Sequence, residues 1–435
     1  MGFSELSVGR GVPLEIRRGE CFVRRDEIRP PQTHPGGRYD LGMSKNPEKP
    51  RRVRAKSIED SLDVRAGFGQ RGLSRRQFLE LSMLASTGTL LAGCGPAPSG
   101  TGYGKRILVL GGTNFLGPAI VERATECGHQ VTLFNRGITR PHLFPELEKL
   151  RGERRIEGGD LAALSGPRRW DVVIDVWPER SELVRQTVEL LSERTDYYFF
   201  CSSVAVYRDF SQSGLNESAP TWIDEPGWYG GEKAVAEAVV AERFPGRSGV
   251  VRCHAILGPR DNGAAYHYWL RRLATYDEVL APGTGVDPVQ YVDVLDVAAW
   301  IVDCCEQSRD GVYNLCGPNQ TLTLRAFLDG SREAIGSSAK LAWVDADFLR
   351  SEHGVHSFTD LPLWAPLDED AGFYQVDGSK AVAAGAAFRP LSETARSAWR
   401  WYQSYFFKDA SFPRDGMGLS RERETELLEA WRSAG

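Results

Sequence analysis

The sequence predicts an α/β protein built on a doubly wound parallel sheet. From residue 105 onward, short apolar runs alternate with helical patterns, and a glycine-rich turn joins the first run to the first helix. Such alternation is typical of a parallel sheet that is covered by helices on both faces. The 435 residues are 41% hydrophobic with a net charge of -5, which favours a globular body and gives no electrostatic footprint for nucleic acid.

The first 72 residues predict no folded element. They are polar, rich in Arg, Pro and Gly, and show no sustained apolar period, so they bury too little surface to offset the entropy of ordering. The basic run at residues 49–56 resembles a nucleic-acid patch, but a solvated leader is the favoured interpretation. Met43 is an alternative start of the chain.

Residues 73–95 have the pattern of an export signal. Arg75 and Arg76 precede a broken apolar run at 78–91, which is shorter than the roughly 20 residues of a membrane-spanning helix. The segment resembles a bacterial twin-arginine signal, with Glu80 as a departure, and residues 91–94 resemble a lipobox that would place a lipid on Cys94. The alternative is a buried amphipathic helix that ends at a glycine.

These patterns predict the domain organisation. Residues 1–93 form a disordered leader and signal peptide, 94–104 a linker, 105–250 a nucleotide-binding domain, and 251–435 mainly a substrate-binding portion with strands that return to the main sheet. The expected location is the periplasm or, through Cys94, the membrane surface. If the signal is not used, the protein stays in the cytoplasm.

The first strand, turn and helix predict a Rossmann-like dinucleotide site. The strand is expected at Ile107–Leu110, the helix at Leu116–Cys127, and the second strand at Val131–Phe134. Gly111 allows a tight turn and Gly117 lets helix and strand pack closely, so that the helix N-terminus meets a pyrophosphate. The middle glycine of the usual fingerprint is replaced by Asn114. The predicted cofactor-binding residues of this turn are Gly111, Gly112, Thr113, Asn114, Phe115, Leu116 and Gly117.

Three further segments bear on the cofactor. The second strand ends in Asn135 and Arg136, where a carboxylate would bind the ribose of NAD, so the sequence favours NADP over NAD. Asp160 follows a third short strand and is expected to accept a hydrogen bond from the adenine amino group. Residues 170–177 are expected to form a fourth strand beneath the cofactor.

The catalytic candidates are Ser203, Tyr229 and Lys233. An aromatic strand at 197–207 contains Ser203, and Tyr229 and Lys233 lie four residues apart on one face of an alanine-rich helix at 228–244. Of the 14 tyrosines, only Tyr229 has a lysine four residues later. An ammonium near a phenol favours the phenolate, which can then act as a general base. The alternative is a structural helix with a chance pair.

The same helix begins with two glycines. Gly230 and Gly231 each cost a helix about 1 kcal/mol relative to alanine. The sequence interpretation is that nicotinamide or substrate approaches the helix closely at these positions.

From Lys105 to about Trp401 the chain resembles an extended or atypical short-chain dehydrogenase/reductase of the NAD-dependent epimerase/dehydratase family. The resemblance rests on Gly111, Gly112, Gly117, Ser203 and the Tyr229–Lys233 pair, and residues 251–262 and 288–302 resemble family segments that line the cleft. Residues 110–122 are especially similar to a branch that includes chloroplast stem-loop RNA-binding proteins.

The resemblance implies hydride transfer. Tyr229 takes a proton from a substrate hydroxyl, Ser203 hydrogen-bonds the same oxygen, and Lys233 also holds the nicotinamide ribose. Ala255 stands where sugar-nucleotide members often have an asparagine for the diphosphate, which argues against a nucleotide sugar. His254 beside it is either a ligand-facing group or a satisfied histidine at a strand end.

The rest of the chain is expected to supply the substrate wall. Trp364, Phe373 and Tyr374 either stack on a sugar ring or seal the core, and the amphipathic C-terminal helices pack on the body. The eight cysteines show no metal-binding spacing, so no metal site is predicted. The expected partner is a small molecule; no nucleic acid is expected, a membrane only through Cys94, and a homodimer is compatible with the sequence.

An exported enzyme meets no dinucleotide pool outside the cell. It must therefore retain its cofactor and regenerate it within each cycle, as an epimerase or dehydratase does. The leading hypothesis is such chemistry on a hydroxylated small molecule, with a cell-envelope sugar as one example. The alternatives are an NADP-dependent reductase that exchanges its cofactor and a non-catalytic binding protein on the same fold.

Overall fold

The computed structural model describes residues 104–176, 180–261, 265–367, 371–405 and 418–434, and two short strands near the N-terminus. Those strands, β1 (Glu15–Arg17) and β2 (Glu20–Phe22), pair antiparallel within a unit that spans residues 1–43. Residues 44–435 form the second unit. The predicted export signal, Cys94 and Met43 all lie outside the described residues.

A seven-stranded parallel sheet organises the second unit, and it confirms the predicted fold class. Its order is β5-β4-β3-β6-β7-β8-β12. The strands are β3 (Arg106–Leu110), β4 (Gln130–Asn135), β5 (Glu148–Arg151), β6 (Trp170–Asp175), β7 (Thr195–Ser203), β8 (Ser248–Cys253) and β12 (Gly311–Leu315). The strand order reverses between β3 and β6, where a crevice at the carboxyl ends is the usual ligand site of such sheets. The predicted domain boundary at residue 250 falls inside β8, and β12 joins the sheet from the second half of the chain.

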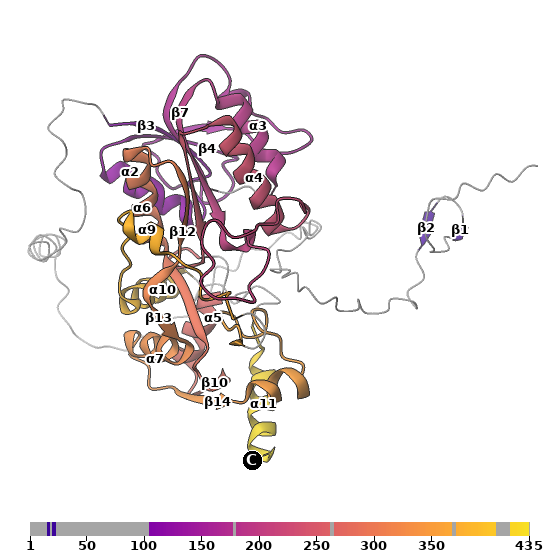
Figure 1. Cartoon of the computed structure of the whole chain (residues 1–435). Helices are drawn as coiled ribbons and strands as arrows, with labels where there is room; N and C mark the ends of the chain where they lie inside the picture. Colours follow the sequence, from indigo (N-terminus) through magenta and orange to yellow (C-terminus); the bar gives the residue numbers. More distant parts are fainter. Residues whose placement is uncertain are drawn as a thin grey trace, which may run out of the picture. The chain divides into compact units, whose positions relative to one another are not determined.

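Helices cover both faces of this sheet. The helices α2 (Leu116–Glu126) and α6 (Val294–Gln307) pack together on one face, and α3 (Ser181–Leu191) and α4 (Tyr229–Arg243) on the other (Figure 1). The alternation of β3 explains this arrangement, because Ile107 and Val109 belong to the first core while Leu108 and Leu110 belong to the second. Short 3-10 turns lie at η2 (Ala162–Leu164) and η3 (Val204–Val206).

The second half of the chain has smaller sheets and a core of its own. One sheet has the order β13-β11-β9, and β10 pairs in parallel with β14. The strands are β9 (Ala255–Leu257), β10 (Glu278–Pro282), β11 (Pro288–Asp293), β13 (Gly317–Thr323) and β14 (Lys340–Val344). The helices are α5 (Ala265–Thr275), α7 (Leu324–Ala334), α9 (Ser379–Ala383), α10 (Leu391–Tyr405) and α11 (Arg421–Ala434), with a π-helical turn η4 (Phe348–Glu352). Trp269, Phe327 and Trp364 are fully buried in this core.

The C-terminal helix α11 is fixed by a buried carboxylate. Glu424 accepts the backbone N–H of Leu280 at 2.9 Å and pairs with Arg272 and with Arg421. Leu427 and Leu428 of the same helix are buried. This helix therefore packs on the body through both its apolar face and its charge. Among the described residues, no helix is long and apolar enough to cross a membrane.

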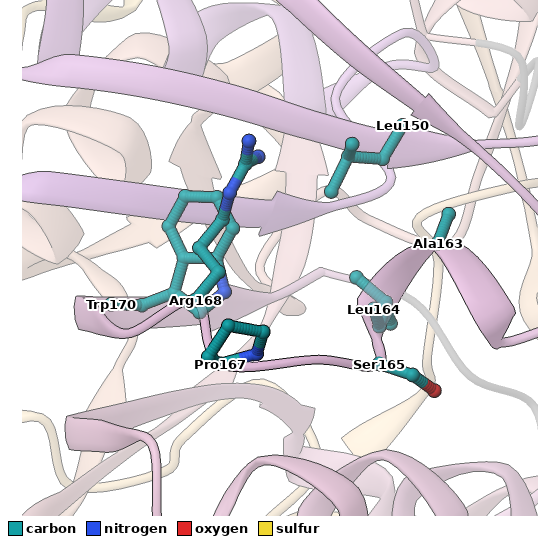
Figure 2. Close-up of a pocket in the computed structure, with 7 residues that line it drawn as sticks. All are labelled: Leu150, Ala163, Leu164, Ser165, Pro167, Arg168 and Trp170. Atoms are coloured by element: carbon teal, nitrogen blue, oxygen red, sulfur yellow. The ribbon is translucent and has the colours of Figure 1, made fainter.

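A surface hollow lies beside the edge strand β5. Its lining comes from β5, η2 and the start of β6, and Figure 2 shows these residues: Leu150, Ala163, Leu164, Ser165, Pro167, Arg168 and Trp170. The Arg168 guanidinium lies 5.4 Å from the centre of the Trp170 ring. None of the predicted catalytic or cofactor-binding residues lines this hollow, so it is separate from the candidate site.

Candidate functional site

The glycine turn between β3 and α2 has the geometry of a dinucleotide-binding turn. Gly111 and Gly112 have φ values of +124° and +87°, which L side chains rarely adopt. A Cβ atom on Gly117 would lie 2.6 Å from the Cα of Gly112, so only glycine lets the helix approach the turn this closely. The three glycines of the predicted fingerprint are thus each required by the backbone.

The start of α2 is free of negative charge. Its first turn contains no acidic residue, and Phe115, the residue before the helix, has a φ of +40° and no capping side chain. Thr113 and Leu116 are buried, whereas Asn114 is exposed and its carbonyl accepts the Gly117 N–H at 3.0 Å. Backbone N–H groups and the helix dipole therefore make this end favourable for a pyrophosphate.

The carboxyl end of β4 is basic. The Asn135 amide donates to the Gly111 carbonyl at 3.3 Å, and its oxygen accepts from Arg151 at 2.6 Å. Arg136 is half exposed and pairs with Glu153 at 3.3 Å. Two guanidinium groups thus lie around the strand end where an acidic residue would select NAD.

Asp160 is exposed in the segment after β5. Its carboxylate accepts the Ala162 N–H at 3.0 Å, and its backbone pairs with Glu153. The carboxylate thus holds the turn before η2, and its predicted contact with adenine stays a prediction.

Ser203 and Tyr229 lie at one corner of the sheet. Ser203 ends β7, and its hydroxyl accepts the Ala205 N–H at 3.2 Å. Tyr229 is the first residue of α4 and is half-buried. A Cβ atom on Gly230 would lie 2.0 Å from the Ala205 carbonyl oxygen, so the start of α4 packs directly against the segment that follows Ser203.

The two glycines of α4 have a different cause from the predicted one. The Gly230 position is closed by Ala205 and by the Trp228 ring, and a Cβ on Gly231 would lie 2.1 Å from the Glu225 carbonyl oxygen. The close neighbours are therefore the protein's own backbone and an indole ring. The prediction that nicotinamide or substrate explains these glycines was wrong.

Lys233 is buried below this corner. Its side chain is 2% exposed, and Nζ donates to the Cys201 carbonyl at 2.8 Å. Nζ also lies 4.8 Å from the centre of the Phe200 ring and 5.8 Å from that of Tyr229. Burial lowers the pKa of Lys233 to about 8. The lysine therefore remains mostly charged near neutrality, one helical turn from Tyr229.

A buried ion pair near the site was not predicted from the sequence. Arg252 of β8 donates to both carboxylate oxygens of Glu237, which is one turn after Lys233 on α4. The Ser202 hydroxyl donates to the same carboxylate, and Arg252 also donates to Tyr207 at 3.0 Å. The i+4 spacing of Lys233 and Glu237 is visible in the sequence, but the partner on β8 depends on tertiary packing.

His254 and Trp364, the predicted substrate contacts, are engaged within the protein. His254 is 5% exposed; Nε2 bonds the Phe373 carbonyl at 2.6 Å, and Nδ1 accepts the Ala255 N–H at 2.8 Å. Burial lowers the pKa of His254 to about 4. Trp364 is fully buried and donates to Asp287 at 3.0 Å. These positions correct the expectation, because neither ring presents a polar group to a ligand.

Comparison with known proteins agrees with this geometry. Residues 107–316, which include the glycine turn and the Ser203, Tyr229 and Lys233 positions, match a family model. This part of the chain matches the NAD dependent epimerase/dehydratase family.

Two curated proteins are similar to this chain. The Chloroplast stem-loop binding protein of 41 kDa b of Arabidopsis thaliana is 25% identical over 232 residues, which is 49% of this chain and 59% of that protein. The alignment thus spans less than two thirds of that relative. The Epimerase family protein SDR39U1 of Bos taurus is 26% identical over 255 residues, 54% of this chain and 82% of that protein.

Solved structures share the fold. The Bordetella bronchiseptica enzyme WbmH, solved with NAD+, has a TM-score of 0.52 at 16% identity and covers 69% of this chain and 99% of its own. The UDP-glucuronic acid 4-epimerase of Bacillus cereus, solved with NAD, has a TM-score of 0.51 at 16% identity with the same coverage. At these identities the likeness establishes the Rossmann-like architecture and leaves the substrate open.

Proposed function

We propose that the protein is an NAD(P)-dependent epimerase/dehydratase-type oxidoreductase that acts on a hydroxylated small molecule, with a sugar as the leading class. The observation that carries the proposal is the buried Lys233 ammonium, which lies one helical turn from Tyr229. Ser203 ends the neighbouring strand at the same corner. Burial of a lysine ammonium costs free energy, and buried ionisable groups of this kind cluster at functional sites. Activation of an adjacent phenol is a function that such a lysine can serve.

Each of the three residues has a distinct task in this proposal. Tyr229 takes the proton from a substrate hydroxyl, and Ser203 hydrogen-bonds the same oxygen. Lys233 holds the nicotinamide ribose and favours the phenolate of Tyr229. When bound, the nicotinamide would supply hydride-transfer chemistry at the carbon that carries this oxygen.

NADP is the proposed form of the cofactor. Arg136 and Arg151 lie at the end of β4, and Asn135 occupies the position where a carboxylate would repel a 2′-phosphate. Glu153 partly balances these charges by pairing with Arg136. The solved neighbours WbmH and the Bacillus cereus epimerase contain NAD, so the preference rests on the residues of this chain.

Cofactor retention and export are proposed together. A twin-arginine route carries folded proteins, and an exported enzyme has no cofactor pool to draw on. Five cysteines in the described part of the chain are buried free thiols, which suits folding in a reducing compartment before export. They are Cys201, Cys253, Cys304, Cys305 and Cys316. Anchoring through Cys94 belongs to the same proposal.

The test is turnover with defined sugars. Purified protein is incubated with NAD+ or NADP+ and a panel of free sugars and nucleotide sugars, and epimers or dehydrated products are followed by NMR. We expect conversion of at least one sugar, and a loss of at least about 100-fold in Tyr229→Phe because the general base is removed. Tyr313→Phe is the matched control, because Tyr313 lies on the edge strand β12 and its hydroxyl donates to the Asp310 carbonyl. Equal activity of Tyr229→Phe and the wild type would exclude the proposed mechanism.

A further inference from the structure

Ser203 lies in a short span of chain that is held at both ends. The span runs from Ser202, near the end of β7, through the buried turn η3 to Tyr207. The Ser202 hydroxyl donates to the Glu237 carboxylate on α4, and the Tyr207 hydroxyl donates to Asn314 on β12 at 2.6 Å. The residues on both sides of the candidate catalytic serine thus have fixed partners on neighbouring elements.

One guanidinium joins these two anchors. Arg252 lies beside Ser202 in the register of β7 and β8. Its Nη2 donates to Glu237 at 2.7 Å, its Nε donates to both carboxylate oxygens at 3.1 and 3.2 Å, and its Nη1 donates to the Tyr207 hydroxyl at 3.0 Å. The guanidinium carbon also lies 4.9 Å from the centre of the Tyr207 ring. Both ends of the span that contains Ser203 therefore depend on the same side chain.

The arginine itself has little freedom to move. Arg252 is 5% exposed, Glu237 is 7% exposed and Tyr207 is 1% exposed. The Arg252 Nη1 also donates to the Glu217 carbonyl at 3.2 Å. A guanidinium fork has a fixed geometry, so it can bond a carboxylate and a phenol at once only when both groups stand in defined places. Arg252 therefore ties the position of α4 to the segment around Ser203.

Stability alone does not account for this arrangement. A buried ion pair adds little net stability compared with apolar residues of similar volume, although removal of one partner is costly. An apolar contact between β8 and α4 could therefore supply the same stability. The observed pair adds defined hydrogen-bond directions, which an apolar contact lacks.

We propose that Arg252 is a positioning residue that holds the Ser203 hydroxyl in place for the substrate oxygen, a proposal that rests on the proposed function. The helix α4, which begins with Tyr229, also contacts β7 and η3 directly. By bonding Glu237 of this helix, Arg252 adds a further connection, so that Ser203 and Tyr229 keep a constant separation. Such precision matters, because a shift of a catalytic group by about 1 Å can cost about 100-fold in rate.

The proposal is tested by a double-mutant cycle with Ser203, using the full chain and a sugar that the wild type converts. Arg252→Lys keeps a positive charge opposite Glu237 but cannot bond the carboxylate and Tyr207 with one fixed fork. We expect this variant to lower kcat about tenfold, while the KM for the sugar and the affinity for NADPH change by less than about threefold. In a Ser203→Ala background, the same change is expected to lower kcat by less than about twofold, because the hydroxyl that Arg252 positions is gone.

The control variant disturbs a buried pair elsewhere. Arg272→Lys affects the pair with Glu424 that holds α11, and it is expected to lower stability but to keep kcat within about twofold of the wild type. Circular dichroism and urea unfolding of each variant separate a loss of rate from a loss of folded protein. If Arg252→Lys fails to fold, Tyr207→Phe replaces it in the cycle, because that variant removes only the hydroxyl that joins Arg252 to Asn314. Its kcat is expected to fall about threefold, again only when Ser203 is present.

The cycle has distinguishable outcomes. A loss of kcat that requires the Ser203 hydroxyl supports the positioning role of Arg252. An unchanged kcat in the folded variant, or the same fractional loss in both backgrounds, would overturn this role and leave the proposed function standing. A wild type that converts no sugar of the panel would instead overturn the proposed function, and the positioning role with it.

Discussion

At the scale of single residues, the central feature of the candidate site is the buried ammonium of Lys233. Lys233 is buried, and its Nζ donates to the Cys201 carbonyl at 2.8 Å. Its proposed partners lie at the ends of elements, since Tyr229 is the first residue of α4 and Ser203 the last of β7. The fold thus buries the Lys233 ammonium, which costs free energy, at the place where the chemistry is proposed.

This burial predicts a pH-dependent stability. The folded pKa of Lys233, about 8, lies below its ordinary value of 10.5, so between these values the unfolded chain binds more protons. Wild-type stability is therefore expected to rise with pH across this window, relative to Lys233→Met, by about 3 kcal/mol in total. Urea unfolding of both proteins at pH 7.5 and pH 10 measures the difference. A gap between the two proteins that is the same at both pH values would refute the burial of a charged lysine.

The basic end of β4 predicts a change in cofactor preference. Arg136→Ala is expected to weaken NADPH binding about tenfold and NADH binding much less, because only NADPH carries a 2′-phosphate. Arg169→Ala provides the control, since Arg169 is exposed and bonds the Glu193 carbonyl away from the site. Titration of each variant with both dinucleotides gives the ratio of its affinities for NADPH and NADH. Equal losses for NADPH and NADH would remove the basis for an NADP preference.

The residues differ in how far the sequence could locate them. The Tyr229–Lys233 spacing and the glycine turn are local patterns, so both could be read directly. Arg252 and Glu237 come from different elements, and nothing in their neighbours in sequence signals that they meet. His254 lies between β8 and β9 and could be assigned either role until its two backbone partners were known.

At the scale of elements, close approach of backbone determines where glycine is needed. The helix α2 meets the turn at Gly117, and the sequence predicted this contact because it belongs to a known turn pattern. The same physical cause operates at the start of α4, where Gly230 faces η3. At Gly230 the sequence predicted a nearby ligand instead, because the sequence of a helix does not show which backbone segment packs against it.

Gly117→Ala tests this close approach. The added Cβ would meet the Cα of Gly112 at 2.6 Å, so we expect a loss of about 1–3 kcal/mol in unfolding free energy and a marked loss of dinucleotide binding. Gly330→Ala in α7 is the control, because its Cβ would meet only the Leu391 side chain, at 3.1 Å. That control is expected to change stability by less than about 1 kcal/mol and leave binding intact. Unchanged NADPH affinity in Gly117→Ala would argue against a dinucleotide at this turn.

The docking of α11 gives a prediction about stability alone. Glu424→Ala leaves Arg272 buried without its carboxylate and the Leu280 N–H without its acceptor, so a loss of about 3–5 kcal/mol is expected. Glu426→Ala, which removes an exposed pair with Arg423, is expected to cost about 1 kcal/mol or less. Urea denaturation measures both. Similar small losses in the two variants would show that α11 is held by its apolar face.

At the scale of the whole molecule, the two halves of the chain have different architectures. The strand order of the parallel sheet reverses between β3 and β6, and the second half of the chain contributes β12 to this sheet while keeping a separate core. The alternation of strand and helix made the first half predictable. The second half mixes short strands and helices, so its pattern was harder to predict. Trp364, which was expected to contact substrate, is buried in the core.

The most direct test of a retained, internally regenerated cofactor is the content of the purified protein. The full chain is produced in the cytoplasm, dialysed extensively and denatured, and any released dinucleotide is identified and quantified by chromatography and mass spectrometry. We predict close to one NADP or NAD per chain. A protein that emerges empty and binds added dinucleotide only weakly would contradict retention and point to a reductase that exchanges its cofactor.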